Sequence, residues 1–201
     1  MFSAVIKGVS LSASLIMAIG SQNAQVLRMG LRREHVLLTV ACCVVCEALL
    51  ISAGVLGIGQ VLQLYPGLLA WAKWGGALFL LYYGGRAFYA AWQDQSMQIE
   101  AEGQRLSWQT ALAMVLAVTL LNPHVYLDTV ILLGSVAAQQ GETAKWWFAL
   151  GAVLNAMIWY SLLGFGARLL SPLFARPIAW RVLDYLIALM MLLLAASLVW
   201  G

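Results

Sequence analysis

Long apolar runs dominate this sequence and limit what it can fold into. Six of them, each roughly 20 residues or longer, lie near residues 5–27, 36–61, 68–92, 108–137, 146–167 and 178–200. A helix of that length spans the hydrocarbon core of a bilayer, whereas the core helices of soluble proteins are shorter. Because 63% of the residues are hydrophobic and only 9% are charged, the chain lacks the polar surface of a soluble domain. We predict an all-α integral membrane protein with about six transmembrane helices.

One polar connection, residues 93–107, divides the chain into two halves of three runs each. We predict that residues 1–92 form one three-helix repeat, that residues 93–107 are a cytoplasmic connection, and that residues 108–201 form the second repeat of one compact membrane domain. Three crossings per half would turn the second half upside down, as in the inverted repeats of many transporters. Weak internal similarity between residues 22–27 and 122–127, and between the Gly-x-Gly motifs at 57–59 and 164–166, supports this interpretation.

Basic residues mark one side of the membrane. They gather in the first, third and fifth connections: Arg28, Arg32, Arg33, Arg105, Arg168, Arg176 and Arg181. The positive-inside rule therefore predicts that these connections are cytoplasmic and that the C-terminus is outside. Lys7 weakens the first run, which leaves the side of the N-terminus open, and the absence of a clear cleavage site disfavours a signal peptide. The basic residues form no patch with interleaved aromatics, so we expect no nucleic-acid binding.

Two carboxylates, Glu47 and Asp128, lie well inside apolar runs. A carboxylate at the middle of a membrane helix costs roughly 3 kcal/mol on insertion scales, and such residues usually face a bundle interior or a water-filled cavity. They indicate a substrate or proton site. The alternative is that each is protonated, or pairs with a basic residue such as Lys73 or Arg86, and only holds helices together.

A predicted helix break occurs at a corresponding place in each half. The first is Gly20-Ser21-Gln22-Asn23, and the second is Asn122-Pro123-His124. Pro123 lacks an N–H and frees carbonyls near residues 119 and 120. Broken helices at membrane depth line cavities, and their positive N-terminal ends can hold an anionic group. The alternative is an ordinary proline kink with a Gly/Ser packing notch.

The breaks and the carboxylates together describe a ligand with two charges. Amides of Gln22, Asn23 and Asn122 suit a carboxylate, and Glu47 and Asp128 suit a cation or protons. A basic amino acid carries both groups, and proton-coupled antiport is the corresponding chemistry. No metal site and no cofactor are expected, and the sequence leaves open whether the protein forms a homo-oligomer.

Three further polar residues are weaker candidates for the site. Asn155 suits either the ligand or a hydrogen bond between helices, and Tyr126 suits either ligand contact or packing. His124 suits a proton relay or a bond to the freed carbonyls.

Cys43-Val-Val-Cys46 has the spacing of a redox motif, so a membrane thiol-redox protein is an alternative from another class. A relay across the bilayer needs partner cysteines, and the second half has none. Buried, unreactive thiols are the expectation.

Four stretches of the chain carry a family resemblance: residues 19–24 (Ile-Gly-Ser-Gln-Asn-Ala), 30–33, 74–84 and above all 121–129 (Leu-Asn-Pro-His-Val-Tyr-Leu-Asp-Thr). They resemble the lysine exporter (LysE) family, most closely its arginine exporter (ArgO) branch. The resemblance implies a transporter rather than an enzyme, which exports L-arginine, L-lysine or similar amino acids across a bacterial inner membrane. Export of neutral or homoserine-type amino acids is the alternative within the same class.

The resemblance also places the family's intramembrane acidic pair on Glu47 and Asp128. Two positions depart from the family pattern. Glu47 stands where the arginine branch is expected to have Asp, and Ser21 stands in place of a proline.

Overall fold

The structure, a computed structural model, describes residues 1–17, 20–59, 64, 66–92, 106–170 and 172–200, and every major element within them is a helix. The first half contains α1 (Phe2–Ile16), α2 (Ser21–Arg32), α3 (Val36–Val55) and α5 (Pro66–Trp92). The second half contains α7 (Trp108–Leu120), α8 (Pro123–Val125), the π-helix η1 (Tyr126–Leu133), α9 (Gly134–Ala138), α10 (Ala144–Gly166), the short 3₁₀ helices η2 (Ala167–Leu170) and η3 (Leu173–Ala175), and α11 (Pro177–Trp200). Most of the predicted polar connection, residues 93–105, lies outside the described residues.

Three helices in the described part of the chain are long and apolar enough to cross a membrane: Val36–Val55, Ala144–Leu170 and Ile178–Ser197. The bent pair of α1 and α2, whose axes differ by 82°, makes a fourth candidate if it is one span. The prediction of an all-helical, multi-pass membrane protein is thus confirmed, with three to four candidate spans where the sequence suggested about six. α5 is 27 residues long, but its charged residues, tyrosines and glycines make it less apolar than those three.

The second predicted break divides another of the six runs. α7 ends at Leu120, and α8 begins at Pro123. The apolar helices on either side, Trp108–Leu120 and Tyr126–Ala138, are each too short to span a membrane alone.

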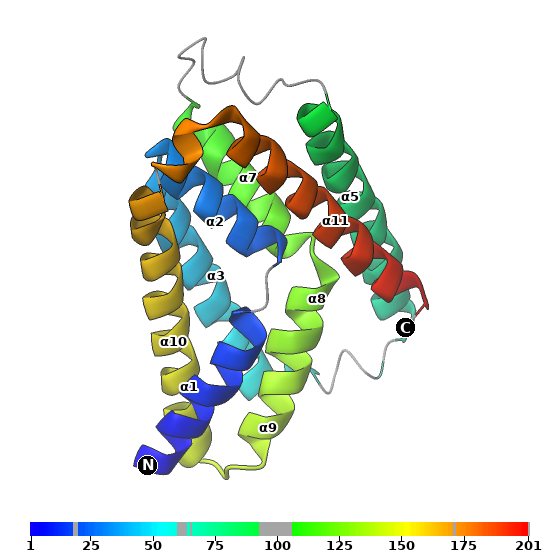
Figure 1. Cartoon of the computed structure of the whole chain (residues 1–201). Helices are drawn as coiled ribbons and strands as arrows, with labels where there is room; N and C mark the ends of the chain where they lie inside the picture. The colour runs from blue at the N-terminus through cyan, green and yellow to red at the C-terminus, as the bar shows by residue number, and fades with distance from the viewer. Residues whose placement is uncertain (18–19, 60–63, 65, 93–105, 171, 201) are drawn as a thin grey trace.

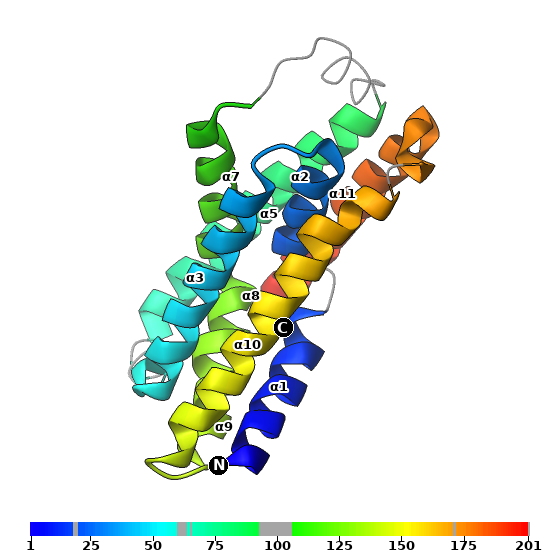
Figure 2. The same ribbon diagram turned by 90° about the vertical axis from the view of Figure 1, so that its left-hand side faces the viewer.

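The path of the chain alternates between two ends of the molecule (Figures 1 and 2). α1 and α2 run from the N-terminal end to the opposite one, α3 returns, and α10 and α11 likewise run in opposite directions. The turn between α2 and α3 lies at the same end as η2 and η3 (Figure 1). We call this the basic end, after Arg32, Arg33, Arg168 and Arg176. Connections that the sequence assigned to one side of a membrane therefore lie together in space.

Glycines allow several of these helices to approach one another closely. A Cβ atom added at Gly134 would lie 2.7 Å from the carbonyl oxygen of Gly54, which brings the start of α9 against α3. One added at Gly8 would collide with the Phe148 backbone, and one added at Gly30 with the Gly164 backbone, so α1 and α2 each pack tightly on α10. Small residues at helix contacts are typical of membrane bundles, where lipid provides no hydrophobic drive between helices.

The interior contains separate apolar clusters, and α2 lies between two of them. Ala24 and Leu31 of α2 belong to a cluster with α5 and α11, in which Leu80 and Met191 are fully buried. Val26 belongs instead to a cluster with α3, α7 and α10. α5 and α11 lie along each other (Figure 1), and we call them the α5–α11 pair. α2 joins this pair to the rest of the bundle.

Candidate functional site

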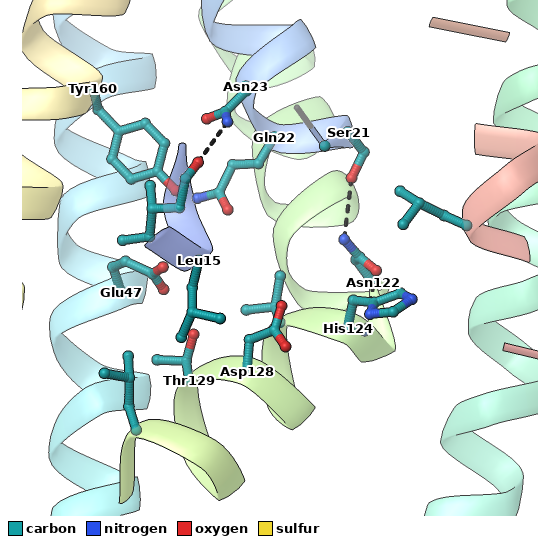
Figure 3. Close-up of a pocket in the computed structure, with 15 residues that line it drawn as sticks. Leu15, Ser21, Gln22, Asn23, Glu47, Asn122, His124, Asp128, Thr129 and Tyr160 are labelled. Atoms are coloured by element: carbon teal, nitrogen blue, oxygen red, sulfur yellow. Dashed lines mark hydrogen bonds between the residues drawn. The ribbon is translucent and has the colours of Figure 1, made fainter. Parts of the chain in front are cut away.

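The two helix breaks meet at a polar cavity in the middle of the molecule (Figure 3). α1 ends at Ile16 and α2 begins at Ser21, while α7 and α8 are separated between Leu120 and Pro123. The cavity has a volume of about 110 Å³, which is room for several water molecules or a small polar group. Its lining comes from seven elements and the two breaks, and includes Ile16, Gly20, Ser21, Gln22, Asn23, Glu47, Asn122, His124, Asp128, Thr129, Tyr160 and Leu194.

Glu47 is the most deeply buried carboxylate of the cavity. It lies on α3 with 3% of its surface exposed, and its Oε2 atom has no hydrogen-bond partner among the described residues. Neither Glu47 nor Asp128 forms an ion pair in the described part of the chain, which excludes the Lys73 side chain. A buried acceptor without a partner is costly and calls for a proton or a ligand.

Asp128 reaches the same cavity from η1 (Figure 3). The π-helical turn is wider than an α-helical one, and such turns occur frequently at functional sites. Here the π-helix follows directly on the break at Pro123 and carries both Asp128 and the buried Thr129. Two carboxylates facing one cavity attract a cation, or require a proton when the cavity is empty.

Asn23 and Asn122, which the sequence suggested as ligand-binding amides, line the cavity and also hydrogen-bond within the protein. The Nδ2 atom of Asn23 donates to the carbonyl of Ile16 over 2.7 Å, and its Oδ1 atom accepts from Trp159 over 3.2 Å. The Nδ2 atom of Asn122 donates to the hydroxyl of Ser21 over 3.3 Å. These bonds satisfy polar groups that the broken helices leave without partners.

Ser21 and Asn122 also connect the two breaks directly. The Ser21 hydroxyl donates to the carbonyl of Val118 over 3.2 Å, near the end of α7. The Oδ1 atom of Asn122 accepts from the backbone N–H of His124 over 3.2 Å and so caps α8. Ser21, which replaces the proline expected from the family resemblance, therefore bonds to the other half of the chain.

Gln22 is the amide that remains available. It lies in the first turn of α2, is 6% exposed, and its Nε2 atom has no partner among the described residues. Its side chain points into the cavity, toward the region between Glu47 and Asp128 (Figure 3). The N-terminus of α2 adds the positive end of a helix dipole at the same place. A donor and two acceptors thus face one space.

The three weaker candidates have structural partners outside the cavity centre. The Tyr126 hydroxyl donates to the carbonyl of Leu120 over 2.8 Å, which is one of the carbonyls that the break frees. Asn155 donates to the Ser12 hydroxyl over 3.1 Å and joins α10 to α1. The His124 ring contacts the hydroxyl of Ser197 over 3.2 Å rather than a freed carbonyl. Of these three, only His124 lines the cavity.

A third buried carboxylate, Asp184, was not predicted from the sequence. It lies on α11 with no exposed surface and forms an ion pair with Arg28 over 2.6 Å. The signal was present, since Asp184 interrupts the sixth apolar run as Glu47 interrupts the second. A charge seven residues from the start of α11 is easily read as belonging to the polar end of the helix.

Comparison with known proteins agrees with the resemblance described above. The sequence profile of the LysE type translocator family matches residues 13–201. The "Putative amino-acid transporter YggA" of Aeromonas salmonicida is 42% identical over 201 residues, which cover 100% of this chain and 98% of that protein. The arginine exporter protein ArgO of Yersinia enterocolitica is 40% identical over 199 residues, which cover 98% of this chain and 97% of that protein. No solved structure matches the chain significantly.

Proposed function

Since this chain belongs to the family of LysE type translocators, we propose that it is a secondary transporter that exports basic amino acids, L-arginine or L-lysine, by exchange for protons. The observation that carries the proposal is a pair of buried atoms at one cavity, Gln22 Nε2 and Glu47 Oε2, neither of which has a hydrogen-bond partner in the described part of the chain. The name of the related ArgO protein supports the choice of substrate.

The cavity offers complementary groups to the two ends of a basic amino acid. Gln22 and the N-terminus of α2 are hydrogen-bond donors for the α-carboxylate. Glu47 and Asp128 are acceptors for the cationic side chain, and charge-assisted hydrogen bonds of this kind are the strong ones. When the substrate leaves, protons neutralise the same carboxylates, because two unpaired charges at one buried cavity are unfavourable. Competition between substrate and proton for one site is the basis of antiport.

The proposed transport cycle uses the two breaks as the points where the bundle changes shape. Residues 1–92 and 108–201 would act as inverted three-helix repeats that rock around the cavity and expose it to each side in turn. The basic end would face the cytoplasm of a bacterial inner membrane, and the C-terminus the periplasm. The scheme uses protons and needs no cofactor or metal.

Counterflow in proteoliposomes tests the proposal. Purified protein is reconstituted with internal arginine, lysine, ornithine, canavanine or homoserine at two internal pH values, and uptake of labelled arginine is measured. We expect exchange with the basic amino acids but not with homoserine, and a rate that depends on internal pH. Effective exchange by homoserine would favour a neutral amino-acid exporter instead.

Substitution of the carboxylates tests the assigned site. Glu47→Gln and Asp128→Asn keep shape and remove charge, so each should abolish arginine counterflow while the amount of reconstituted protein stays the same. Glu47→Asp keeps the charge and should retain part of the activity. Its half-saturation concentration for arginine should be higher, because the side chain is one methylene shorter. Full transport by Asp128→Asn would contradict the assignment.

A further inference from the structure

A second group of buried polar residues lies outside the cavity, where α2 meets the α5–α11 pair. Arg28 and Asp184 form its centre, with 2.6 Å between Nη2 and Oδ1. The Tyr83 hydroxyl of α5 donates to Oε1 of Gln25 over 3.1 Å beside them. Asp184 and Gln25 are almost completely buried, whereas the Arg28 side chain is 25% exposed. Water therefore reaches the cation of the pair more readily than the anion.

This ion pair lies between the cavity and the basic end. Arg28 follows the cavity residue Gly20 by eight positions, which is about 12 Å along α2. Asp184 precedes the cavity residue Leu194 by ten positions, roughly 15 Å along α11. On each helix, the step from the cavity residue to the ion-pair residue leads toward the basic end, where α2 finishes and α11 begins (Figure 1). A solute that moves from the basic end to the cavity along the contact between α2 and α11 would meet Asp184 first.

Asp184 is only half satisfied by Arg28. Its Oδ2 atom is buried and has no hydrogen-bond partner among the described residues, although its Oδ1 atom is paired. A guanidinium group approaching from a suitable direction can bind both oxygens of a carboxylate at once, and this bidentate arrangement is stronger than a single contact. Arg28 is attached to α2, which limits the direction of its guanidinium group, whereas the guanidinium group of a free substrate has no such limit. The substrate can therefore replace Arg28 on Asp184.

We infer that Asp184 is a second binding site for the cationic side chain of the substrate, which Arg28 occupies when the site is empty. The inference rests on the proposed export of basic amino acids. Binding of substrate to Asp184 releases Arg28 and breaks the ion pair between α2 and α11, while the hydrogen bond from Tyr83 to Gln25 still joins α2 to α5. The cationic group then moves on to Glu47 and Asp128. Asp184 thus acts as an entry site, and Arg28 as an internal competitor of the substrate.

Arginine counterflow with three variants of the full chain tests this inference. Asp184→Asn should raise the half-saturation concentration about thirtyfold or more, the effect expected when one member of a buried charge pair is removed. Arg28→Gln should lower it, because the competitor is gone. The double variant Arg28→Gln/Asp184→Asn removes both charges of the pair, so it should fold. Its half-saturation concentration should be raised as much as that of Asp184→Asn.

A purely structural ion pair makes different predictions for the same variants. Both single substitutions would then impair the protein in the same direction, and the double variant would return to the wild-type half-saturation concentration. Either result would overturn the inference. Arg32→Gln is the matched control, because Arg32 is one turn further along α2 and pairs with Glu34 over 3.5 Å; it should change nothing. Absence of arginine or lysine counterflow in the wild type would instead refute the proposed function itself.

Discussion

Gln22 and Asn23 are neighbours in the first turn of α2, yet their amides have different roles. Asn23 bonds to the end of α1 and to Trp159, so it holds the break in shape. The Nε2 atom of Gln22 has no hydrogen-bond partner among the residues that the structure describes. At the residue scale, Asn23 therefore differs from the amide that we propose to bind substrate in the hydrogen bonds it already forms and not in the kind of polar group it carries.

Gln22→Met tests the binding role of this amide. Methionine has a similar size but cannot donate, so arginine should bind more weakly by about 1.5–3 kcal/mol, the usual value of a hydrogen bond to a charged group. Agmatine, which is arginine without the carboxylate, should compete equally well against wild type and variant in counterflow. Gln139→Met, at an exposed position, is the control. An equal loss for arginine and agmatine would exclude a contact between Gln22 and the carboxylate.

At the scale of elements, the contact between α3 and the start of α9 depends on glycines. The three atoms nearest to a Cβ added at Gly134 all belong to the Gly54 backbone, at 2.7–2.8 Å, and backbone cannot move aside as a flexible side chain can. This contact positions η1, and with it Asp128, relative to Glu47 on α3. Backbone contact between the two elements thus determines the spacing of the two carboxylates.

Gly134→Ala should therefore separate η1 from α3. We expect it to destabilise the protein by about 1–3 kcal/mol, as overpacking of a close contact does, and to reduce arginine transport as well. Gly85→Ala is the matched control, since nothing lies within 4 Å of an added Cβ there, and alanine favours a helix. Thermal unfolding of both variants in detergent gives the comparison. A Gly134→Ala protein as stable and active as wild type would show that the backbones of Gly54 and Gly134 are not in close contact.

At the scale of the whole molecule, the basic residues of separate connections gather at one end. The positive-inside rule then predicts that this end is cytoplasmic. Glu142, in the turn between α9 and α10, lies at the opposite end with its side chain 91% exposed. Pro172, between η2 and η3, is exposed at the basic end.

Cysteine labelling measures this orientation in intact cells. A cysteine-free background is made with Cys42→Ser, Cys43→Ser and Cys46→Ser, and should export arginine normally because these thiols form no disulfide, with Cys43 and Cys46 buried and Cys42 partly buried. Loss of export in that background would favour the thiol-redox alternative. Glu142→Cys should then react with a membrane-impermeant maleimide from outside, and Pro172→Cys only after permeabilisation. The reverse pattern would invert the proposed topology.

The sequence by itself determined the class of fold and the position of both breaks, because these depend on local properties. A run of apolar residues reports that its surroundings are lipid, and Pro123 interrupts a helix wherever it lies. The two carboxylates of the cavity could also be predicted, since a charge inside such a run is unfavourable without a special environment.

Only the tertiary structure decided which polar groups are free to bind. Asn23 and Asn122 suit a ligand by residue type, but they bond to backbone and side chains that folding brings beside them. The Arg28–Asp184 pair joins residues 156 positions apart, and neither residue alone indicates the other. The polar groups that can bind a ligand inside a membrane protein are those that the fold itself leaves without partners. Which groups these are depends on contacts between distant parts of the chain.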